Sequence, residues 1–164
     1  MAVEQQGTGV QVLQLEPQAF FCIRETVPVA NLGEAMGARL GVIRGYLQQG
    51  NAKVAGPPFV RYHTFGDTET DFELGIPVAE PVESEGRITT GELPGGPAVT
   101  TWHVGAHDKL GEAYARIQAF IEQHGYEASG PAWEVYYWLD PNQEADPTNW
   151  DPSTWRTQLV QPLK

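Results

Sequence analysis

Apolar side chains follow two rhythms along this chain, one typical of strands and one typical of helices. Short apolar or alternating runs predict strands at 10–15, 18–27, 58–65, 70–78, 87–93, 98–104, 132–140 and 156–163. Two longer segments, 31–51 and 108–125, carry apolar residues three and four positions apart and predict helices. The turn residues "GDTE" between the third and fourth runs predict a hairpin. The pattern therefore predicts an α+β fold with two main helices.

The order of these elements occurs twice. The tetrapeptide "LGEA" opens both predicted helices, at 32–35 and 110–113, and "GP" precedes the following strand at 56–57 and 130–131. Phe59 then matches Trp133, and Tyr62 matches Tyr136. We interpret this as a duplicated strand–helix–strand–strand unit with a period of about 75 residues.

The duplication makes a prediction about architecture. The pseudo-repeats cover about 17–80 and 87–163 of a single domain spanning 1–164. An α+β unit of this kind needs its copy to complete an antiparallel sheet and to bury both helices. The groove between the two copies is then the expected place for a ligand.

Glu134 is the candidate residue that the repeat brings out. Strand alternation puts Glu134, Tyr136 and Trp138 on one face, among aromatic neighbours. A buried carboxylate is costly unless an arginine, a tyrosine hydroxyl or a backbone amide satisfies it, or unless it faces water at a sheet edge. The matching position of the first copy holds Val60, so the fold itself does not require an acid here. From the residues alone, Glu134 is either an acid satisfied by such a partner or by water, or a pocket acid; as a pocket acid it would suit, with its aromatic neighbours, a delocalised cation.

Composition and charge narrow the possible partners. The 164 residues are 41% apolar and carry a net charge of −11, which fits a globular protein and disfavours direct binding to nucleic acid. The lone Cys22 excludes an intrachain disulfide. No signal peptide opens the sequence and no apolar run is long enough to span a membrane, so we expect a cytoplasmic protein without membrane contact.

Other aromatic and histidine residues are weaker candidates. Trp102 lies on the strand before the second predicted helix, and Tyr62 is the repeat counterpart of Tyr136, so both are expected to line the groove. His103 is a candidate partner near the groove, but the four histidines lack the spacing of a metal site. No phosphate-binding or dinucleotide-binding signature is present, so neither a cofactor nor a metal is expected. The loop at 141–155, which contains Trp150 and ends at Trp155, is a candidate lid.

These motifs together resemble a known family. "GP", an aromatic residue, "WEVY", a Pro-rich loop and the terminal "TQLVQPL" are similar to the second half of GyrI-like small-molecule-binding domains. "GPPFVRYH" and "DTETDFELGIPV" are similar to the first half, so the resemblance covers about 17–163. The family includes effector-binding domains of AraC-type and MerR-type multidrug regulators, gyrase-inhibitor-like proteins and hydrolases of cyclopropane-containing genotoxins.

The resemblance implies roles for particular residues. Multidrug-binding members use a glutamate on the penultimate strand to pair with lipophilic cations, and this residue maps onto Glu134, with Tyr136 as the following pocket tyrosine. No helix-turn-helix precedes the matching region, so the chain is not expected to bind DNA itself.

Three functions follow as expectations. The first is capture of a bulky, lipophilic, cationic aromatic compound by a set of ligand-binding residues: Glu134, Tyr136, Tyr62, Trp138, Trp102 and His103. The second is hydrolysis, with Glu134 as the base and Tyr136 as a hydrogen-bond donor to the developing oxyanion. The third is a gyrase-inhibitor-like interaction with a protein partner, either a topoisomerase or a regulator.

Overall fold

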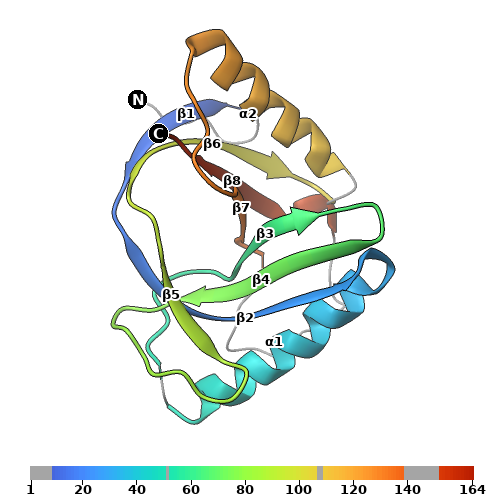
Figure 1. Ribbon diagram of the computed structural model, residues 1–164, viewed down its shortest axis with the longest axis vertical. Helices are drawn as coiled ribbons and strands as arrows, with labels where there is room; N and C mark the ends of the chain where they lie inside the picture. Colours follow the sequence, from blue (N-terminus) through green and yellow to red (C-terminus); the bar gives the residue numbers. More distant parts are fainter. Residues whose placement is uncertain (1–8, 51, 107–108, 139–151) are drawn as a thin grey trace.

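The computed structural model describes residues 9–50, 52–106, 109–138 and 152–164. Eight strands and two α-helices make up the described fold (Figure 1). The strands are β1 (Val10–Leu15), β2 (Gln18–Pro28), β3 (Phe59–Phe65), β4 (Glu69–Pro77), β5 (Thr89–Leu93), β6 (Gly96–Val104), β7 (Trp133–Tyr136) and β8 (Arg156–Pro162), and the helices are α1 (Leu32–Gln48) and α2 (Leu110–His124). This confirms the predicted α+β class, and every predicted strand and helix is present. The run at 132–140 forms a shorter strand than predicted, because turn geometry follows Tyr136.

The sheet is antiparallel and symmetric about its middle. Its strand order is β1-β6-β8-β7-β3-β4-β2-β5, so β6, β8 and β7 of the second copy mirror β2, β4 and β3 of the first. The two copies meet where β3 pairs with β7, and the predicted β3–β4 hairpin is formed. This arrangement is the duplicated unit that the sequence predicts.

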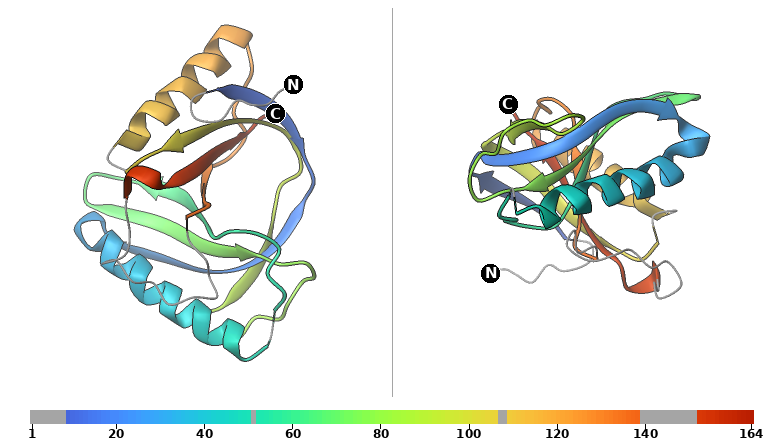
Figure 2. Two further views of the ribbon diagram at one scale, coloured as in Figure 1. Left: turned by 180° about the vertical axis from the view of Figure 1, so that it is seen from behind. Right: turned by 90° about the horizontal axis from the view of Figure 1, so that it is seen from below.

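The strands at 10–28 and 89–104 link the two copies. β1 pairs with β6, and β2 pairs with β5, while β5 and β6 do not pair with each other across the turn "PGGP". Leu15 pairs with Gly96 and Gln18 with Leu93, so one register continues through both pairings. Figures 1 and 2 show the two segments as long curved ribbons that run side by side. They curl the sheet into a half-barrel.

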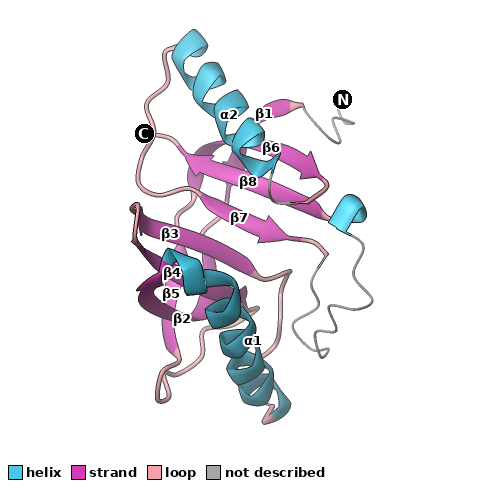
Figure 3. Ribbon diagram, turned by 90° about the vertical axis from the view of Figure 1, so that its right-hand side faces the viewer, coloured by secondary structure: helices cyan, strands magenta, loops and turns pink. Residues whose placement is uncertain are grey.

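Both helices cover the same face of the sheet. α1 packs against β2 and β4, and α2 packs against β6, β8 and β1. The central strands β3 and β7 run between the helices (Figure 3). We call this side the helix face and the other side the far face. None of the described helices has the length and apolar character required to cross a membrane.

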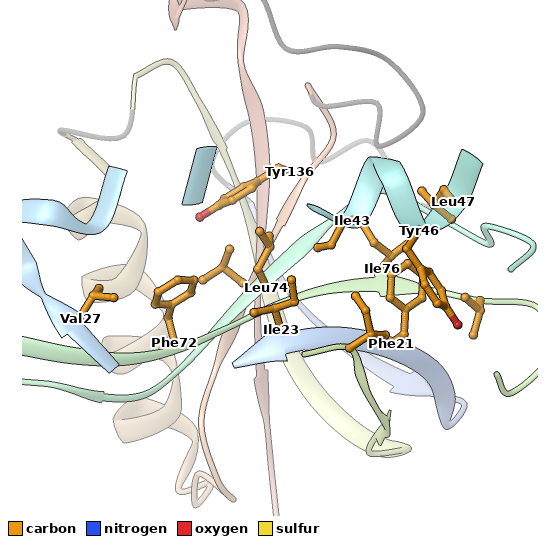
Figure 4. Packing of buried hydrophobic residues seen from close by; sticks show 13 residues of the cluster. Phe21, Ile23, Val27, Ile43, Tyr46, Leu47, Phe72, Leu74, Ile76 and Tyr136 are labelled. Carbon is orange, nitrogen blue, oxygen red and sulfur yellow. The ribbon is translucent and has the colours of Figure 1, made fainter. Parts of the chain in front are cut away.

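The two faces bury different cores. On the helix face, Ile43, Tyr46 and Leu47 of α1 reach the cluster that contains Leu74 and Tyr136 (Figure 4). On the far face, a second cluster contains Phe20, Phe59, Trp133 and Val160, among others.

A glycine is required where the far-face core is tightest. Gly75 is the cross-strand partner of Phe59, and a Cβ atom on it would lie 2.4 Å from Phe59 Cζ. An aromatic ring therefore covers the backbone at this point, and no other residue fits there without displacing the ring.

Candidate functional site

Glu134 lies at the centre of the symmetric sheet. It is the register partner of Val60, so the two positions that match in the sequence repeat face each other across the β3–β7 pair. Cross-strand partners share a face, and both side chains point to the helix face between α1 and α2. Val60 is 0% exposed and Glu134 is 4% exposed. The second copy has therefore placed a carboxylate where the first buries a valine.

Two tyrosines donate hydrogen bonds to this carboxylate. The hydroxyl of Tyr114, on α2, lies 2.5 Å from Oε2 of Glu134, and the hydroxyl of Tyr136 lies 2.7 Å from Oε1. Short distances of this kind are typical of hydroxyl donors to a carboxylate. Among the described residues, no lysine, arginine or histidine forms an ion pair with Glu134. Within the described ranges, the carboxylate is thus hydrogen-bonded but not paired with a positive charge.

Burial dominates the electrostatics of this group. Burial raises the pKa of the Glu134 carboxyl, and the hydrogen bonds from Tyr114 and Tyr136 offset only part of that rise. The pKa values of Tyr114 and Tyr136 are also raised, first by burial and then by the nearby Glu134 charge. Burial and the same charge raise the pKa of Tyr62 as well. The site therefore holds a carboxyl group whose ionisation is opposed by burial, among tyrosines that stay protonated.

The other buried glutamate shows how this chain neutralises a carboxylate elsewhere. Oε1 of Glu73, on the far face, accepts a hydrogen bond from Arg61 Nε at 2.7 Å and lies 3.0 Å from His63 Nε2. Burial alone would raise the pKa of Glu73, but the hydrogen bonds from Arg61 and His63 outweigh it and lower the pKa. Glu134 lacks any such basic neighbour among the described residues.

Aromatic side chains adjoin the carboxylate on the helix face. Tyr62 and Trp138 are partly buried against the cluster that contains Tyr136. The rings of Tyr136 and Trp138 lie 5.5 Å apart, and Trp138 stacks on Trp155 at 3.9 Å with an interplanar angle of 5°. The structure thus gathers Glu134, Tyr136, Tyr62 and Trp138 in one region.

Trp102 does not join this group. It occupies the same cross-strand row as Gln158 and Val135, one position away from the row of Glu134, and therefore points to the far face. There its ring lies 4.9 Å from that of Tyr137, with the Arg156 guanidinium 4.4 Å from its centroid. The expectation that Trp102 lines a groove with Glu134 thus fails on geometry, because strand alternation turns the two side chains to opposite faces.

His103 lies on the helix face but at a distance from Glu134. It shares a cross-strand row with Thr157 and Tyr136, which places it two strands away from Tyr136. Its Nε2 is 2.9 Å from the carbonyl oxygen of Ala106. No contact between His103 and Glu134 occurs in the described part of the chain, so the structure places it at the border of the site.

Tyr114 is the site residue that sequence reasoning missed. Its position among the apolar residues of α2 indicates a core residue, and this interpretation assigns no role to its hydroxyl group. The repeat carries the missing signal: counting from "LGEA", Tyr114 matches Met36 of the first copy. Val60 matches Glu134 in the same way. Both polar residues of the hydrogen-bonded pair therefore replace apolar residues of the first copy.

Two further points concern metal binding and the candidate lid. No three histidine, cysteine, aspartate or glutamate side chains within the described ranges are arranged to hold a metal ion. Most of the candidate lid at 141–155, including Trp150, lies outside the described residues.

Comparison with known proteins identifies the family. The pattern of the GyrI-like small molecule binding domain matches residues 8–155. The chain belongs to this family. No curated protein sequence matches it significantly.

Solved structures share the fold of this GyrI-like chain at low sequence identity. The C-terminal domain of EcmrR is 21% identical, with a TM-score of 0.78 over 96% of this chain and 98% of that one. EcmrR in a DNA complex is 20% identical, with a TM-score of 0.80 over 95% of this chain, which spans only 57% of that longer chain.

Two further neighbours carry other descriptions. A hydrolase encoded by lin2189 from Listeria innocua is 13% identical, with a TM-score of 0.65 over 97% of this chain and 93% of that one. SAV2435 bound to tetraphenylphosphonium is 14% identical, with a TM-score of 0.61 over 95% of this chain and 94% of that one. At these identities the likeness establishes the fold.

Proposed function

We propose that this GyrI-like chain binds a lipophilic aromatic cation on the helix face, with Glu134 as its counter-charge. The observation that carries the proposal is a carboxylate that is 4% exposed, held by Tyr114 and Tyr136, and without a basic partner among the described residues. A buried charge of this kind is costly, and a bound cation would supply the missing partner.

Because the two copies differ at this position, we expect a ligand that carries a single positive charge. The symmetric position of Glu134 is Val60, so the first copy offers an apolar surface where the second offers a charge. A ligand with a single charge and a bulky apolar body matches this arrangement. Tyr136, Tyr62 and Trp138 supply aromatic surface, and an aromatic ring attracts a cation by about 0.5–2 kcal/mol. Tetraphenylphosphonium, the compound bound to the distant relative SAV2435, is a suitable first probe.

Isothermal titration calorimetry tests the proposal. Tetraphenylphosphonium and the neutral triphenylphosphine oxide are titrated into the wild type, Glu134→Gln and Glu134→Val. Removing one partner of a buried charge pair costs about 2 kcal/mol or more, so we expect Glu134→Gln to lose cation affinity at least about thirtyfold, with little change for the neutral compound.

Two control variants separate charge from folding. Glu134→Val copies the first half of the chain, where Val60 is buried in the same setting, so it is expected to fold and to lose the cation. Glu122→Gln removes an exposed acid of α2 and should leave both affinities unchanged. Equal cation affinity in the wild type and Glu134→Gln would refute the proposal.

Hydrolysis of a strained electrophilic ring is the second candidate. The observation that favours it is the hydrogen-bonded Glu134–Tyr136 pair, because a carboxylate made more basic by its raised pKa can accept a proton from water while the tyrosine donates to a developing oxyanion. Incubation with a cyclopropane-bearing alkylating compound, followed by mass spectrometry, decides between the two. Catalytic turnover that Glu134→Gln abolishes would establish the enzyme, whereas stoichiometric capture without product would favour binding alone.

A further inference from the structure

The two copies differ on the far face as well as on the helix face. In the first copy, Arg61 of β3 faces its cross-strand partner Glu73 of β4 and donates a hydrogen bond to it. The Arg61 guanidinium also lies 5.7 Å from the centroid of the Phe20 ring. A long charged side chain and its partner therefore occupy this part of the far face.

The register identifies the corresponding pair in the second copy. Val60 and Glu134 are symmetric partners, so the next residues along the two strands, Arg61 and Val135, are also counterparts. The cross-strand partner of Val135 is Gln158 of β8, as Glu73 is that of Arg61. An arginine–glutamate ion pair in one copy thus corresponds to a valine and a glutamine in the other. The valine is several atoms shorter than the arginine.

A cavity of about 170 Å³ opens where the side chain is shorter. Its apolar wall is formed by Leu15, Leu93, Trp133, Val135 and Val160. The exposed Glu16 also lines it, which places the opening toward solvent beside this residue. A cavity of about 150 Å³ with apolar walls is large enough to hold benzene. The far face therefore offers space for a single aromatic ring.

Two polar groups in the cavity lack strong partners. Thr100 is 2% exposed and lines the cavity, and its hydroxyl forms no hydrogen bond within the described ranges. Gln158 accepts one long hydrogen bond, 3.4 Å from the Tyr137 hydroxyl, and its amide nitrogen donates none to the described residues. A mostly apolar cavity with a few available polar groups is the usual composition of a small-molecule site.

We propose that this cavity is a second ligand site, for a neutral one-ring aromatic compound with one hydroxyl group, such as a phenol. The ring fits the apolar wall beside Trp133, and the hydroxyl can exchange hydrogen bonds with Thr100 and Gln158. No basic side chain is among the described residues that line the cavity, and Glu16 at its opening disfavours an anion.

This site is separate from the one proposed around Glu134. Val135 lies between Glu134 and Tyr136 in β7, but its side chain points to the far face while theirs point to the helix face. A result that refutes one of the two proposals therefore leaves the other unaffected.

Methyl-resolved NMR tests the second site directly. Phenol is titrated into the full chain while the methyl signals of Thr100, Val135, Val160, Leu15 and Leu93 are followed. We expect saturable shifts at these methyl groups at phenol concentrations of about 1 mM. Glu134→Val should bind phenol as the wild type does, so that loss of the cation site leaves this result unchanged. No shift at these methyl groups up to the solubility limit of phenol would overturn the proposal, as would shifts confined to the helix face.

Two variants address the cavity itself. Val135→Met fills the cavity from the position where the first copy holds Arg61, and it should weaken phenol binding at least tenfold. Thr100→Val keeps the shape and removes the hydroxyl, so phenol binding should weaken severalfold while toluene binding stays unchanged. Unchanged phenol affinity in Thr100→Val and Val135→Met, with both variants folded, would refute the assignment.

Discussion

Replacing Glu134 by glutamine should stabilise the ligand-free protein, and the gain should depend on pH. Because burial raises the pKa of Glu134 above its usual value of 4.5, the native state binds this proton more tightly than the unfolded state does. The carboxyl therefore causes no loss of stability below about pH 4.5, where it is protonated in both states. As the pH rises above that value, the unfolded state ionises first and the stability of the native state falls, until the native carboxyl is ionised as well.

The size of the effect follows from the environment of the side chain. Glu134 is 4% exposed and has no basic partner among the described residues, so the cost of its charge is offset only by the hydroxyls of Tyr114 and Tyr136. Replacing even a buried ion pair by well-packed apolar residues is often neutral or stabilises proteins by roughly 1–4 kcal/mol, and a buried charge without a counter-charge is costlier than a pair. Glutamine retains the shape and can still bond both hydroxyls, so we expect about 1–3 kcal/mol at pH 8. For a domain of this size, each kcal/mol corresponds to about 2–4 °C in Tm.

Denaturant unfolding of the wild type and Glu134→Gln at pH 4 and pH 8 measures this difference. The variant should be more stable at pH 8, and the difference should disappear at pH 4. Glu122→Gln, which removes an exposed acid, should differ from the wild type by less than about 0.5 kcal/mol at both values. A Glu134→Gln variant that is less stable than the wild type at pH 8 would show that the carboxylate is neutralised in the native state, and the reasoning would fail.

Four other predictions concern the pH dependence of binding, the packing of two glycines and the reactivity of Cys22. Cation affinity in calorimetry should rise between pH 5 and pH 8, because Glu134 must lose its proton to pair with the ligand; a flat profile would contradict this. Gly37→Ala should raise the free energy of unfolding by about 0.5–1 kcal/mol, since a Cβ atom meets nothing within 4 Å on α1. Gly75→Ala should lower the free energy of unfolding by about 2 kcal/mol or more, since its Cβ would lie 2.4 Å from the Phe59 ring. Equal effects of the Gly37 and Gly75 variants would refute the packing argument. Burial raises the pKa of Cys22 to about 12, so its thiol should resist Ellman's reagent at pH 8 until the chain unfolds; rapid labelling of the native protein would contradict this.

The repeat within the sequence was the most informative predictor of the site. The alignment of Val60 with Glu134 singled out the acid, and strand alternation predicted the shared face of Glu134 and Tyr136, whereas Trp138 lies in the turn after β7 and packs near Tyr136. The same comparison, extended to the helices, pairs Met36 with Tyr114 and could have found the second hydroxyl. It was overlooked because helical spacing alone does not separate a core tyrosine from a hydrogen-bond donor.

Local pattern decided what each segment of this protein becomes. Periodicity fixes which residues form strands and helices, and the duplication fixes their order, because both depend on neighbours a few residues apart. Which strands pair is a different matter. The pairing of β1 with β6 and of β2 with β5 joins residues that are distant in the sequence, such as Val10 with Thr101 and Cys22 with Thr89, and no local signal in "PGGP" distinguishes it from a hairpin.

Long-range strand pairing also decided the geometry of the site. The β3–β7 pair brings Val60 and Glu134 together at the symmetric centre, and the registers of β6, β8 and β7 place Trp102 on the opposite face from Glu134. Whether a buried carboxylate meets a base, as Glu73 meets Arg61, or only hydroxyls, as Glu134 does, depends on which elements pack over it. The sequence thus determined the chemical groups, and the tertiary structure determined their partners, because partners of a buried charge come from distant parts of the chain.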